Sequence, residues 1–545
     1  MEDNTNDNVN IKNPLSKFKP LTQDEIKNII NKMAPKHSQI DPLPTWLVKN
    51  CLNEFLPIIS EIVNTSLITG IMPHTLKHAL IKPLLKGTNL DLVKKNYRPV
   101  SNLKFLSKVV ETAVIQQFTQ HLNVNNLNDP RQSAYKPLHS TETLLSKIHN
   151  DIMIKGNQDE VTILVLLDLS AAFDTIDHDI LLHRLENGYG IKRTALNWFK
   201  SYLSNRTQSV IINDTCSNKK KLRYGVPQGS KLGPLLFNAY IAPLSEIAKR
   251  NDIEDENHAD DEQLILSFKP NPAECLRAKC KIEICINEIR DFLLKNKLCN
   301  NGEKTEFIIV GRKSQLAKVN LQNLQINNCT IRISDKIKNL GVIFDRHMTM
   351  DNHIAKMCRS AYFNIRNISK VKKLVNTDCL KMLVNSLVTP HLDYGNGLLL
   401  GVKLNSINKL QLAQNSAVRL IANLRKHDHI TESRRRLHWL PIKARIEYKV
   451  LANTWKAVNN QAPEYLKSLI KNKESSRHLR SSNSGLLSIP KVNTGNSWGD
   501  RAFSIAGPTL WNKLPQSLRQ INNYNSFKRQ LKTHLFNKYY NNTHA

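Results

Sequence analysis

Asp260 and Asp261 are two adjacent carboxylates at the start of an apolar run, and they are candidate catalytic residues. Carboxylates this close repel each other unless cations lie between them, so a doublet at a tight turn is typical of a site that holds metal ions. The alternative is a solvated loop, because seven of the eleven residues from Asp252 to Glu262 are acidic and a charge run usually faces water. A third carboxylate brought to the same place by another element would favour the metal site.

Asp168 is a candidate for that third carboxylate. It follows the apolar, β-rich run Val161–Leu167, which predicts a buried strand with a carboxylate at its C-terminal end. Because a buried unpaired carboxylate is costly, a metal ion or an arginine should meet it. Asp174, Asp177 and Asp179 follow, and we expect them to cap a helix or to be solvated rather than to bind metal.

A loop with three glycines and two prolines, Tyr224–Pro234, precedes a predicted helix from Leu235 to about Ile247. Glycines such as Gly229 allow backbone to approach a flat or phosphate-bearing ligand closely, and the Gln228 amide offers both a donor and an acceptor. A purely structural turn explains a loop of this composition equally well.

Lys82 and Arg98 lie in two short basic clusters, and Pro99 biases Arg98 toward extended backbone. A guanidinium presented in this way can hold a triphosphate through two hydrogen bonds, and Lys82 can add a point charge. Taken alone, the two residues are also compatible with ordinary surface cations.

Composition limits the remaining possibilities. A chain of 545 residues exceeds one ordinary core, and its net charge is +32, with 32 Lys and Arg against 9 Asp and Glu in residues 351–545. A field of this sign favours polyphosphate partners and salt-dependent binding. The sequence has no apolar stretch near 20 residues and no signal-peptide pattern, so we expect a soluble intracellular protein without a membrane partner. Nine cysteines without a Cys-x-x-Cys pair argue against structural zinc and a disulfide framework.

The helical segments are predicted from apolar residues at three-to-four spacing, as in Trp46–Leu67 and Leu103–Leu122. Near the C-terminus, Arg434–Arg436 are expected to meet phosphate, whereas His427–His429 are expected to form a loop rather than a metal site. Residues 471–497 have the composition of a linker. Aromatic residues of the terminal block are expected to form a small core, with the neighbouring cations binding RNA: Trp498, Phe503, Trp511 and Phe527.

Taken in order, the strand ending in Asp168, the Pro-Gln-Gly loop and the Ala-Asp-Asp turn resemble the motifs of reverse transcriptases. The resemblance covers most of the chain and is closest to the jockey-like non-LTR retrotransposon polymerases. The stretches that carry it are Asp41–Thr45, Asn96–Asn102, Gln132–Thr143, Leu167–Leu185, Gly225–Ile241, Asn301–Glu306, Leu340–Val342, Pro390–Tyr394, Leu437–Pro441 and Ala506–Leu514.

The resemblance implies an α+β right-hand polymerase, with fingers, a palm built on a small antiparallel sheet, a helical thumb and a basic, mostly helical C-terminal region. The expected divisions are a disordered leader (1–20), an N-terminal helical extension (21–75), reverse transcriptase fingers and palm (76–345), a thumb-like helical region (346–430) and the basic C-terminal region (431–545).

The implied reaction is two-metal nucleotidyl transfer from a dNTP to a primer 3′-hydroxyl on an RNA template. Asp168, Asp260 and Asp261 would hold two Mg²⁺ ions about 3.5–4 Å apart, with Mn²⁺ as a possible substitute. Phe173 matches the family's steric gate, which favours dNTP over NTP. Lys304 matches a candidate proton donor to pyrophosphate.

The resemblance also assigns substrate contacts. Lys82 and Arg98 match the finger positions that grip the triphosphate, and Gln228 with Gly229 match the loop under the incoming nucleotide and template. The implied partners are an RNA template, a DNA primer or target, and dNTPs. Relatives usually carry an upstream endonuclease, which we expect to be missing here. The chain would then be a truncated copy, a fragment of a longer open reading frame, or a polymerase served by an endonuclease in trans. Target-primed synthesis would take place in the nucleus, although a cytoplasmic location is also open.

The sequence departs from the family on the catalytic hairpin and its loop. His258 stands where an aromatic residue is usual, Glu262 where Thr is usual, and Lys231 and Asn300 where aliphatic residues are usual, while Glu254–Asn257 are polar. The alternative hypothesis is therefore a catalytically degenerate relic that only binds nucleic acid. A viral RNA-dependent RNA polymerase is disfavoured, because the gate phenylalanine and the Pro-Gln-Gly loop resemble the DNA-making enzymes.

Overall fold

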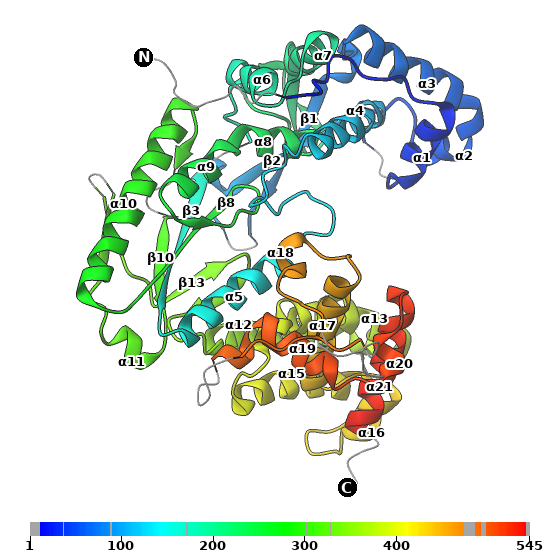
Figure 1. Ribbon diagram of the computed structural model, residues 1–545. Helices are drawn as coiled ribbons and strands as arrows, with labels where there is room; N and C mark the ends of the chain where they lie inside the picture. The colour runs from blue at the N-terminus through cyan, green and yellow to red at the C-terminus, as the bar shows by residue number, and fades with distance from the viewer. Residues whose placement is uncertain are drawn as a thin grey trace. The chain divides into compact units, whose positions relative to one another are not determined.

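The computed structural model describes residues 11–35, 38–87, 90–170, 173–300, 304–326, 329–473, 485–491 and 498–540 (Figure 1). The fold is α+β, as predicted. The chain forms two compact units built from alternating segments rather than from successive ones. The first unit takes residues 1–135, 168–251 and 285–303, and the second takes residues 136–167, 252–284 and 304–545.

The first unit surrounds one mixed sheet with helices (Figure 1). The strand order is β2-β1-β4-β5, with β6 beside β4; β1 pairs antiparallel with β2 and parallel with β4. Its strands are β1 (His78–Leu85), β2 (Tyr97–Asn102), β4 (Arg206–Ile212), β5 (Thr215–Cys216) and β6 (Lys220–Leu222). Its helices are α1 (Gln23–Lys32), α2 (Thr45–Asn50), α3 (Leu52–Thr69), α4 (Phe105–Val124), α6 (His178–Asn187), α7 (Arg193–Leu203), α8 (Gly233–Ile241) and α9 (Pro243–Arg250).

Two helices predicted as continuous are each divided into two. The segment 46–67 forms α2 and α3, which meet at Cys51, whose ψ of 37° departs from helical geometry. The segment 235–247 forms α8 and α9, and Pro243 begins α9 because proline lacks the N–H that a continuing helix would need. Both errors concern boundaries, which local geometry rather than apolar spacing decides.

Residues 11–20 are held against the first unit, unlike the loose leader expected from their polar composition. Leu15 forms a β-bridge with Ile191, and its amide donates to the Gly190 carbonyl at 3.0 Å. Phe18 is 2% exposed and packs edge-on against Trp198 with ring centroids 5.9 Å apart. One buried aromatic residue is enough to anchor an otherwise polar segment. Residues 1–10 lie outside the described part of the chain.

The second unit contains a sheet of order β10-β3-β8-β7 and two smaller hairpins (Figure 1). Strand β3 continues beyond Leu167 into the first unit, where its last residues pair with β9. The strands of the second unit are β3 (Val161–Ser170, up to Leu167), β7 (Glu254–Asp255), β8 (Asp261–Phe268), β10 (Glu306–Val310), β11 (Asn323–Ile326), β12 (Cys329–Arg332), β13 (Lys336–Asn339) and β14 (Val342–Asp345), whereas β9 (Cys299–Asn300) belongs to the first unit. The strand predicted to end at Asp168 is therefore present, and its partners β10 and β9 pair with it antiparallel.

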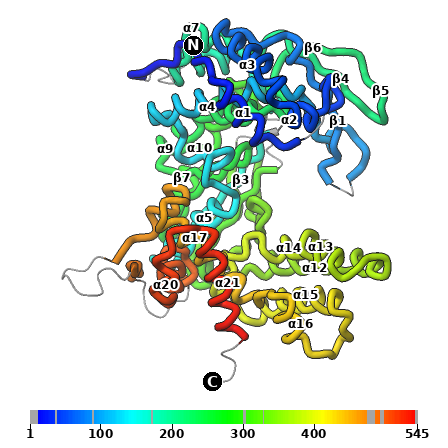
Figure 2. The backbone as a smooth tube through the Cα atoms, turned by 90° about the vertical axis from the view of Figure 1, so that its right-hand side faces the viewer, coloured from blue at the N-terminus to red at the C-terminus, as the bar shows by residue number. Residues whose placement is uncertain are grey.

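Helices make up the rest of the second unit, and α12, α13, α14 and α15 pack on one another (Figure 2). Helix α10 (Pro272–Lys295) belongs to the second unit up to Ile284. The others are α5 (Thr141–Asn157), α11 (Lys313–Leu316), α12 (Asp351–Val371), α13 (Thr377–Leu387), α14 (Thr389–Asp393), α15 (Leu404–Ala422), α16 (Thr431–Arg436), α17 (Ile442–Val458), α18 (Glu464–Lys467), α19 (Phe503–Asn512), α20 (Gln516–Arg519) and α21 (Tyr524–Tyr540).

Two of the four aromatic residues predicted to form a core in the terminal block, Trp511 and Phe527, share one, whereas Phe503 is buried in a second cluster and Trp498 is partly buried. Trp511 and Phe527 are 1% and 0% exposed and cluster with Trp455 of α17. One of the cations predicted to bind phosphate also has a structural contact: the Arg434 Nε donates to the Tyr540 hydroxyl at 2.6 Å, and its guanidinium lies 5.4 Å from the Tyr540 ring centre. The phosphate contact of Arg434–Arg436 stays a prediction.

Residues 427–429 form a loop, as predicted, in which the Asp428 carboxylate accepts from the Arg425 amide at 2.6 Å. The predicted linker 471–497 is described only at residues 471–473 and 485–491, where Asn472 and Leu487 form a β-bridge. The cysteines whose placement is described are all free thiols. None of the helices in the described ranges is long and apolar enough to cross a membrane.

Two buried histidines make the second unit sensitive to acid. Burial, with a smaller effect from the Arg501 charge, lowers the pKa of His149 to about 3, and burial and Lys356 lower the pKa of His353 to about 4. In an unfolded chain both histidines would have a pKa of about 6.5. Below that pH the unfolded chain binds protons that the folded chain does not, so the free energy of unfolding falls as the pH falls.

We expect each histidine to contribute about 2 kcal/mol of destabilisation between pH 7 and pH 5. Urea unfolding at the two pH values measures the difference, and His149→Gln should reduce it. The exposed loop residue His427 provides the matched control, because His427→Gln should leave the pH dependence unchanged. A free energy of unfolding that is the same at both pH values would contradict the prediction.

Candidate active site

One edge of the sheet in the second unit collects the ends of strands that carry predicted site residues. Strands β3 and β8 are neighbours, and the Thr162 hydroxyl at the start of β3 lies 2.9 Å from the Ser267 hydroxyl near the end of β8. The two strands therefore run in opposite directions. It follows that the second-unit part of β3, which ends at Leu167, and the start of β8 at Asp261 face the same edge of the sheet.

The acidic doublet lies at the tip of a tight hairpin. The amides and carbonyls of His258 and Asp261 bond reciprocally, at 3.0 and 3.2 Å, and leave Ala259 and Asp260 as a two-residue turn. Ala259 has a φ of 60°, as the primed turns that match the twist of paired strands require. The predicted turn is therefore present despite the unusual His258. Burial lowers the pKa of His258, and the neighbouring Asp260 carboxylate opposes that shift.

Lys304 lies at the same edge of the sheet. Strand β10 pairs antiparallel with β3, with Glu306 opposite Leu166, so the residues before Glu306 extend toward the end of β3. Lys304 is exposed and belongs to the second unit. The sheet thus directs the beginning of β10 and the beginning of β8 to opposite sides of the last residues of β3.

Three of the acidic residues of this hairpin are buried rather than solvated, whereas Glu254 is exposed. Asp255, Glu256 and Glu262 are 2%, 2% and 3% exposed. Lys147 of α5 pairs with Glu256 at 3.5 Å and also with Asp151. Burial alone would lower the pKa of Lys147, but Asp151 and Glu256 raise it above its ordinary value. A lysine from another helix thus compensates the acidic hairpin, and the solvated-loop alternative is wrong for these residues.

The metal site itself remains a prediction. Across the described ranges, no group of three or more His, Cys, Asp or Glu side chains is placed to hold a metal ion. Asp168 and Asp260 are partly exposed and Asp261 is exposed, and all three offer the hard oxygen ligands that Mg²⁺ prefers. Their chemistry fits the predicted ions, and within the second unit Asp260 and Asp261 lie together at the tip of the hairpin.

In the first unit, the Pro-Gln-Gly loop is fixed to strand β2. The Ser101 amide donates to the Gln228 carbonyl at 2.7 Å. Gly229 has a φ of 122°, and a Cβ at this position would lie 2.4 Å from the Ser101 carbonyl oxygen. Only glycine fits such a close backbone approach. The loop is thus shaped by its contact with β2 and not only by its own prolines.

Phe173 is fixed to the other side of the same loop. Its carbonyl accepts from the Val226 amide at 2.9 Å, and its ring stacks on Phe237 of α8, with centroids 4.5 Å apart. At Gly225 a Cβ would lie within 2.8 Å of the Asp174 backbone. The predicted gate and the predicted nucleotide loop therefore form one packed assembly.

Lys82 and Arg98 lie on the same face of the β1–β2 pair. Lys82 is opposite Val100 and Leu84 is opposite Arg98, so the two cations are diagonal neighbours, and both are exposed. Since β2 also carries Ser101, one strand joins the two cations to the Gln228 loop. The five predicted substrate residues therefore come together within the first unit.

Gln228 has a side-chain partner, Asp174, that was not predicted from the sequence. The Gln228 amide Nε2 donates to the Asp174 carboxylate at 3.0 Å, which orients the glutamine side chain. Asp174 had been expected to cap a helix or face water, whereas Asp177 does cap α6, as expected, by accepting from the Asp179 and Ile180 amides. The position of Asp174 directly after Phe173 could have predicted its contact with Gln228, because a residue beside the gate must lie near the loop.

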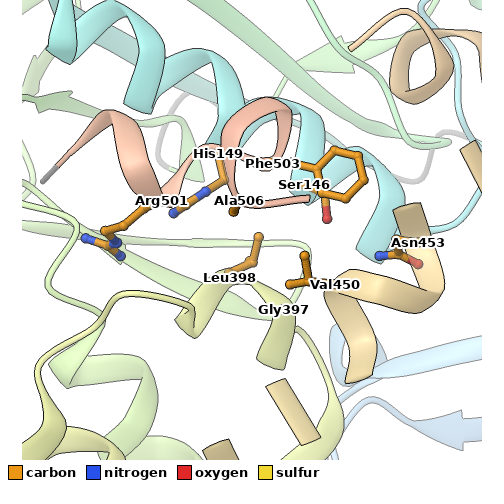
Figure 3. Close-up of a pocket in the computed structure, with 9 residues that line it drawn as sticks. All are labelled: Ser146, His149, Gly397, Leu398, Val450, Asn453, Arg501, Phe503 and Ala506. Carbon is orange, nitrogen blue, oxygen red and sulfur yellow. The ribbon is translucent and has the colours of Figure 1, made fainter. Parts of the chain in front are cut away.

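A small cavity in the second unit is unrelated to these residues. It lies among α5, α17 and α19 and is lined by residues that include His149, Arg501 and Phe503 (Figure 3). Its volume is about 20 Å³, enough for about one water molecule. A nucleotide needs a site at least about ten times larger, so this cavity is not a substrate site.

Comparison with known proteins agrees with this geometry. Residues 84–344 match the family model of reverse transcriptase (RNA-dependent DNA polymerase). The chain is 23% identical over 411 residues to the RNA-directed DNA polymerase from mobile element jockey of Drosophila melanogaster. The aligned region covers 74% of this chain and 44% of that protein. The corresponding protein of Drosophila funebris is 24% identical over 405 residues, or 72% of this chain and 43% of the relative.

A third relative is the probable RNA-directed DNA polymerase from transposon BS of Drosophila melanogaster, 23% identical over 418 residues, or 74% of this chain and 45% of the relative. The chain thus spans less than half the length of these curated relatives. The matched region contains the β3 strand, the Pro-Gln-Gly loop and the Ala-Asp-Asp hairpin. Residues 84–344 thus match a reverse transcriptase domain, and about three quarters of the chain is similar to RNA-directed DNA polymerases from mobile elements.

Proposed function

We propose that the chain catalyses RNA-directed DNA synthesis, transferring a nucleotide from a dNTP to a primer 3′-hydroxyl. The observation that supports the proposal is the edge of the β10-β3-β8-β7 sheet at which β8 begins with Asp261 and β10 begins just after Lys304. A tight turn presents Asp260 beside Asp261 at the same edge. A reverse transcriptase domain around this edge supports the assignment.

Asp168, Asp260 and Asp261 would hold two Mg²⁺ ions, which Mn²⁺ could replace. When bound, such ions activate the primer hydroxyl and stabilise the leaving pyrophosphate in an in-line displacement. The protein's own part is to fix the carboxylates: the hairpin hydrogen bonds hold Asp260 and Asp261, and the continuous strand holds Asp168. Lys304 would donate a proton to the departing pyrophosphate, as a positioned ammonium can.

Lys82 and Arg98 would bind the triphosphate from the exposed face of the β1–β2 pair. Arg98 suits two hydrogen bonds to phosphate oxygens, and Lys82 adds charge. Gln228, oriented by Asp174, and the exposed backbone at Gly229 would contact the incoming nucleotide and template. The proposed partners are thus an RNA template, a DNA primer or target, and dNTPs, with an endonuclease acting in trans and target-primed synthesis in the nucleus.

Primer extension tests the proposal. The full chain is incubated with an RNA template, an annealed DNA primer and dNTPs, in Mg²⁺ and separately in Mn²⁺. Extension that depends on the template and the divalent ion supports the polymerase. Binding of primer–template without extension in either ion contradicts it and favours the nucleic-acid-binding relic, whose basis would be the 32 Lys and Arg of residues 351–545. Such binding should weaken steeply with salt.

Replacing the gate residue should alter sugar selection. In Phe173→Ala the ring that stacks on Phe237 is lost, so the space beside the nucleotide sugar increases and the 2′-hydroxyl no longer clashes. We expect the ratio of NTP to dNTP incorporation to rise by about ten- to a hundredfold. Single-nucleotide incorporation with matched dNTP and NTP gives this ratio.

The exposed Trp46 of α2 supplies the control, because Trp46→Ala removes an aromatic ring from the same unit away from the loop. Its NTP to dNTP ratio should equal that of the wild type. If Phe173→Ala also keeps the wild-type ratio while remaining folded and active, Phe173 does not act as the gate.

A further inference from the structure

Glu111 is a carboxylate buried in the first unit at a position that the sequence motifs do not mark. It lies on α4 and is 0% exposed. Its Oε1 accepts from the Ser107 hydroxyl at 3.0 Å, and its Oε2 accepts from the backbone amides of Lys231 and Leu232 at 2.7 and 3.1 Å. A fully buried glutamate is rare unless hydrogen bonds and charge compensate it, so this one is held by specific partners.

The two amides belong to the junction between the Pro-Gln-Gly loop and α8. Helix α8 begins at Gly233, and its own N-cap residue, Leu232, provides no side-chain cap. The first amides of a helix need acceptors, and their partial positive charge favours a carboxylate. Glu111 supplies that acceptor from 120 residues earlier in the sequence. The start of α8 is therefore fixed by α4 together with the flanking Ser230, whose hydroxyl accepts from the Gly233 amide at 3.0 Å.

Charge compensation comes from Arg206 of β4, which is 1% exposed. Burial raises the pKa of Glu111, and the Arg206 charge and the two amides oppose that shift. Arg206 is itself fixed: its Nη1 donates to the Tyr202 carbonyl at 3.1 Å, and its guanidinium lies 4.8 Å from the Tyr202 ring centre. The hydrogen-bond partners of the carboxylate are therefore Ser107 and the two junction amides, and Arg206 acts on it through its charge.

The Lys231–Leu232 junction that Glu111 holds lies, along the sequence, between the two parts of the proposed nucleotide site. Gln228 and Gly229 precede the anchored amides by two to four residues, and Phe237, which stacks on Phe173, follows them within α8. A shift at the junction would therefore move the loop and the gate together. Displacements near 1 Å at such positions can cost about a hundredfold in rate.

We propose that Glu111 is a positioning residue for nucleotide selection: its carboxylate holds the Lys231–Leu232 junction, and thereby sets the Gln228–Gly229 loop and the Phe173–Phe237 stack. The proposal rests on the proposed function of that loop. It predicts that Glu111 variants change the KM for dNTP and the choice of sugar more than they change primer–template binding.

The first test is steady-state single-nucleotide incorporation by Glu111→Gln. Glutamine keeps the size and one acceptor oxygen but loses the charge opposite Arg206, so we expect the KM for dNTP to rise by about three- to tenfold, with a smaller change in kcat. The Kd for primer–template should stay within about twofold. Ser107→Ala, which removes the donor to Oε1, should shift the KM in the same direction by less. Glu111→Leu removes every acceptor and is the severe variant.

Glu447 is the matched control. It is also a buried glutamate, 7% exposed, and it accepts from Lys538 Nζ at 2.9 Å and from the Tyr539 hydroxyl at 2.7 Å in the second unit. Glu447→Gln should lower thermal stability without changing the KM for dNTP. If Glu111→Gln behaves in this same way, losing activity only in proportion to its folded fraction, the positioning role is overturned.

A second measurement does not depend on activity. Amide hydrogen exchange of residues 227–236 should become about tenfold faster in Glu111→Gln than in the wild type, whereas exchange in α6 should not change. If the wild type fails to extend a primer, the proposed function fails, and this measurement still decides whether Glu111 holds the junction. Unchanged exchange at the junction would show that it does not.

Discussion

Replacing Asp260 with asparagine is expected to lower the rate of primer extension by about a thousandfold while leaving the fold intact. Asparagine keeps the size of the side chain and is well tolerated in hairpin turns, so the His258–Asp261 hydrogen bonds should persist. The lost negative charge removes a ligand for the proposed ions, and loss of one electrostatic partner of a transition state typically costs about a hundred- to a thousandfold. Asp261→Asn should act in the same direction.

Initial rates at saturating dNTP and primer–template measure this effect. Asp214→Asn is the matched control, since Asp214 is an exposed aspartate in the two-residue turn between β4 and β5 and loses the same unit of charge. Its rate should equal that of the wild type. An Asp260→Asn protein that keeps more than about a tenth of the wild-type rate would remove Asp260 from the proposed site.

Adding a single methyl group at Gly229 is expected to lower extension by about a hundredfold. The new Cβ would lie 2.4 Å from the Ser101 carbonyl oxygen, and alanine rarely adopts a φ of 122°. Relief of the clash requires the loop to move away from β2, which breaks the hydrogen bond from the Ser101 amide to the Gln228 carbonyl. A backbone shift of this kind misplaces groups that need placement within about 1 Å.

Gly87→Ala controls for the effect of glycine replacement in the same unit. A Cβ at Gly87 would contact only side-chain atoms of Leu90, at 3.5 Å or more. We expect wild-type extension and thermal stability from this variant, and reduced values of both from Gly229→Ala. Full activity in Gly229→Ala would mean that the close approach to Ser101 does not shape the site.

The sequence predicts local features of this site well. The β-rich run before Asp168 is a strand, the acidic doublet is at a hairpin tip, and Asp177 caps a helix, because each depends on residues within a few positions. The terminal aromatic residues Trp511 and Phe527 are core, as their apolar area suggested.

Features that depend on distant residues could not be predicted in this way. Glu111 and Lys231 are 120 positions apart, and Lys147 and Glu256 are joined only by the fold, so neither pair leaves a periodic signal. The acidic run around the doublet was ambiguous for the same reason, since its burial depends on a lysine in α5. The ends of helices were also misjudged where a single residue, such as Pro243, interrupts an apolar pattern.

The register of the β7–β8 hairpin determines which sequence changes this site can absorb. Glu254 is opposite Ile265 and Asp255 is opposite Leu264, and the pairing continues without a bulge to the His258–Asp261 bridge. Unusual side chains such as His258 occur within it without altering the turn. A one-residue insertion or deletion would instead exchange the faces of successive side chains, turning Asp261 away from its edge. Sequences that diverge from this one by point substitution can therefore keep these carboxylates in place, whereas an insertion or deletion of one residue in this hairpin would displace them.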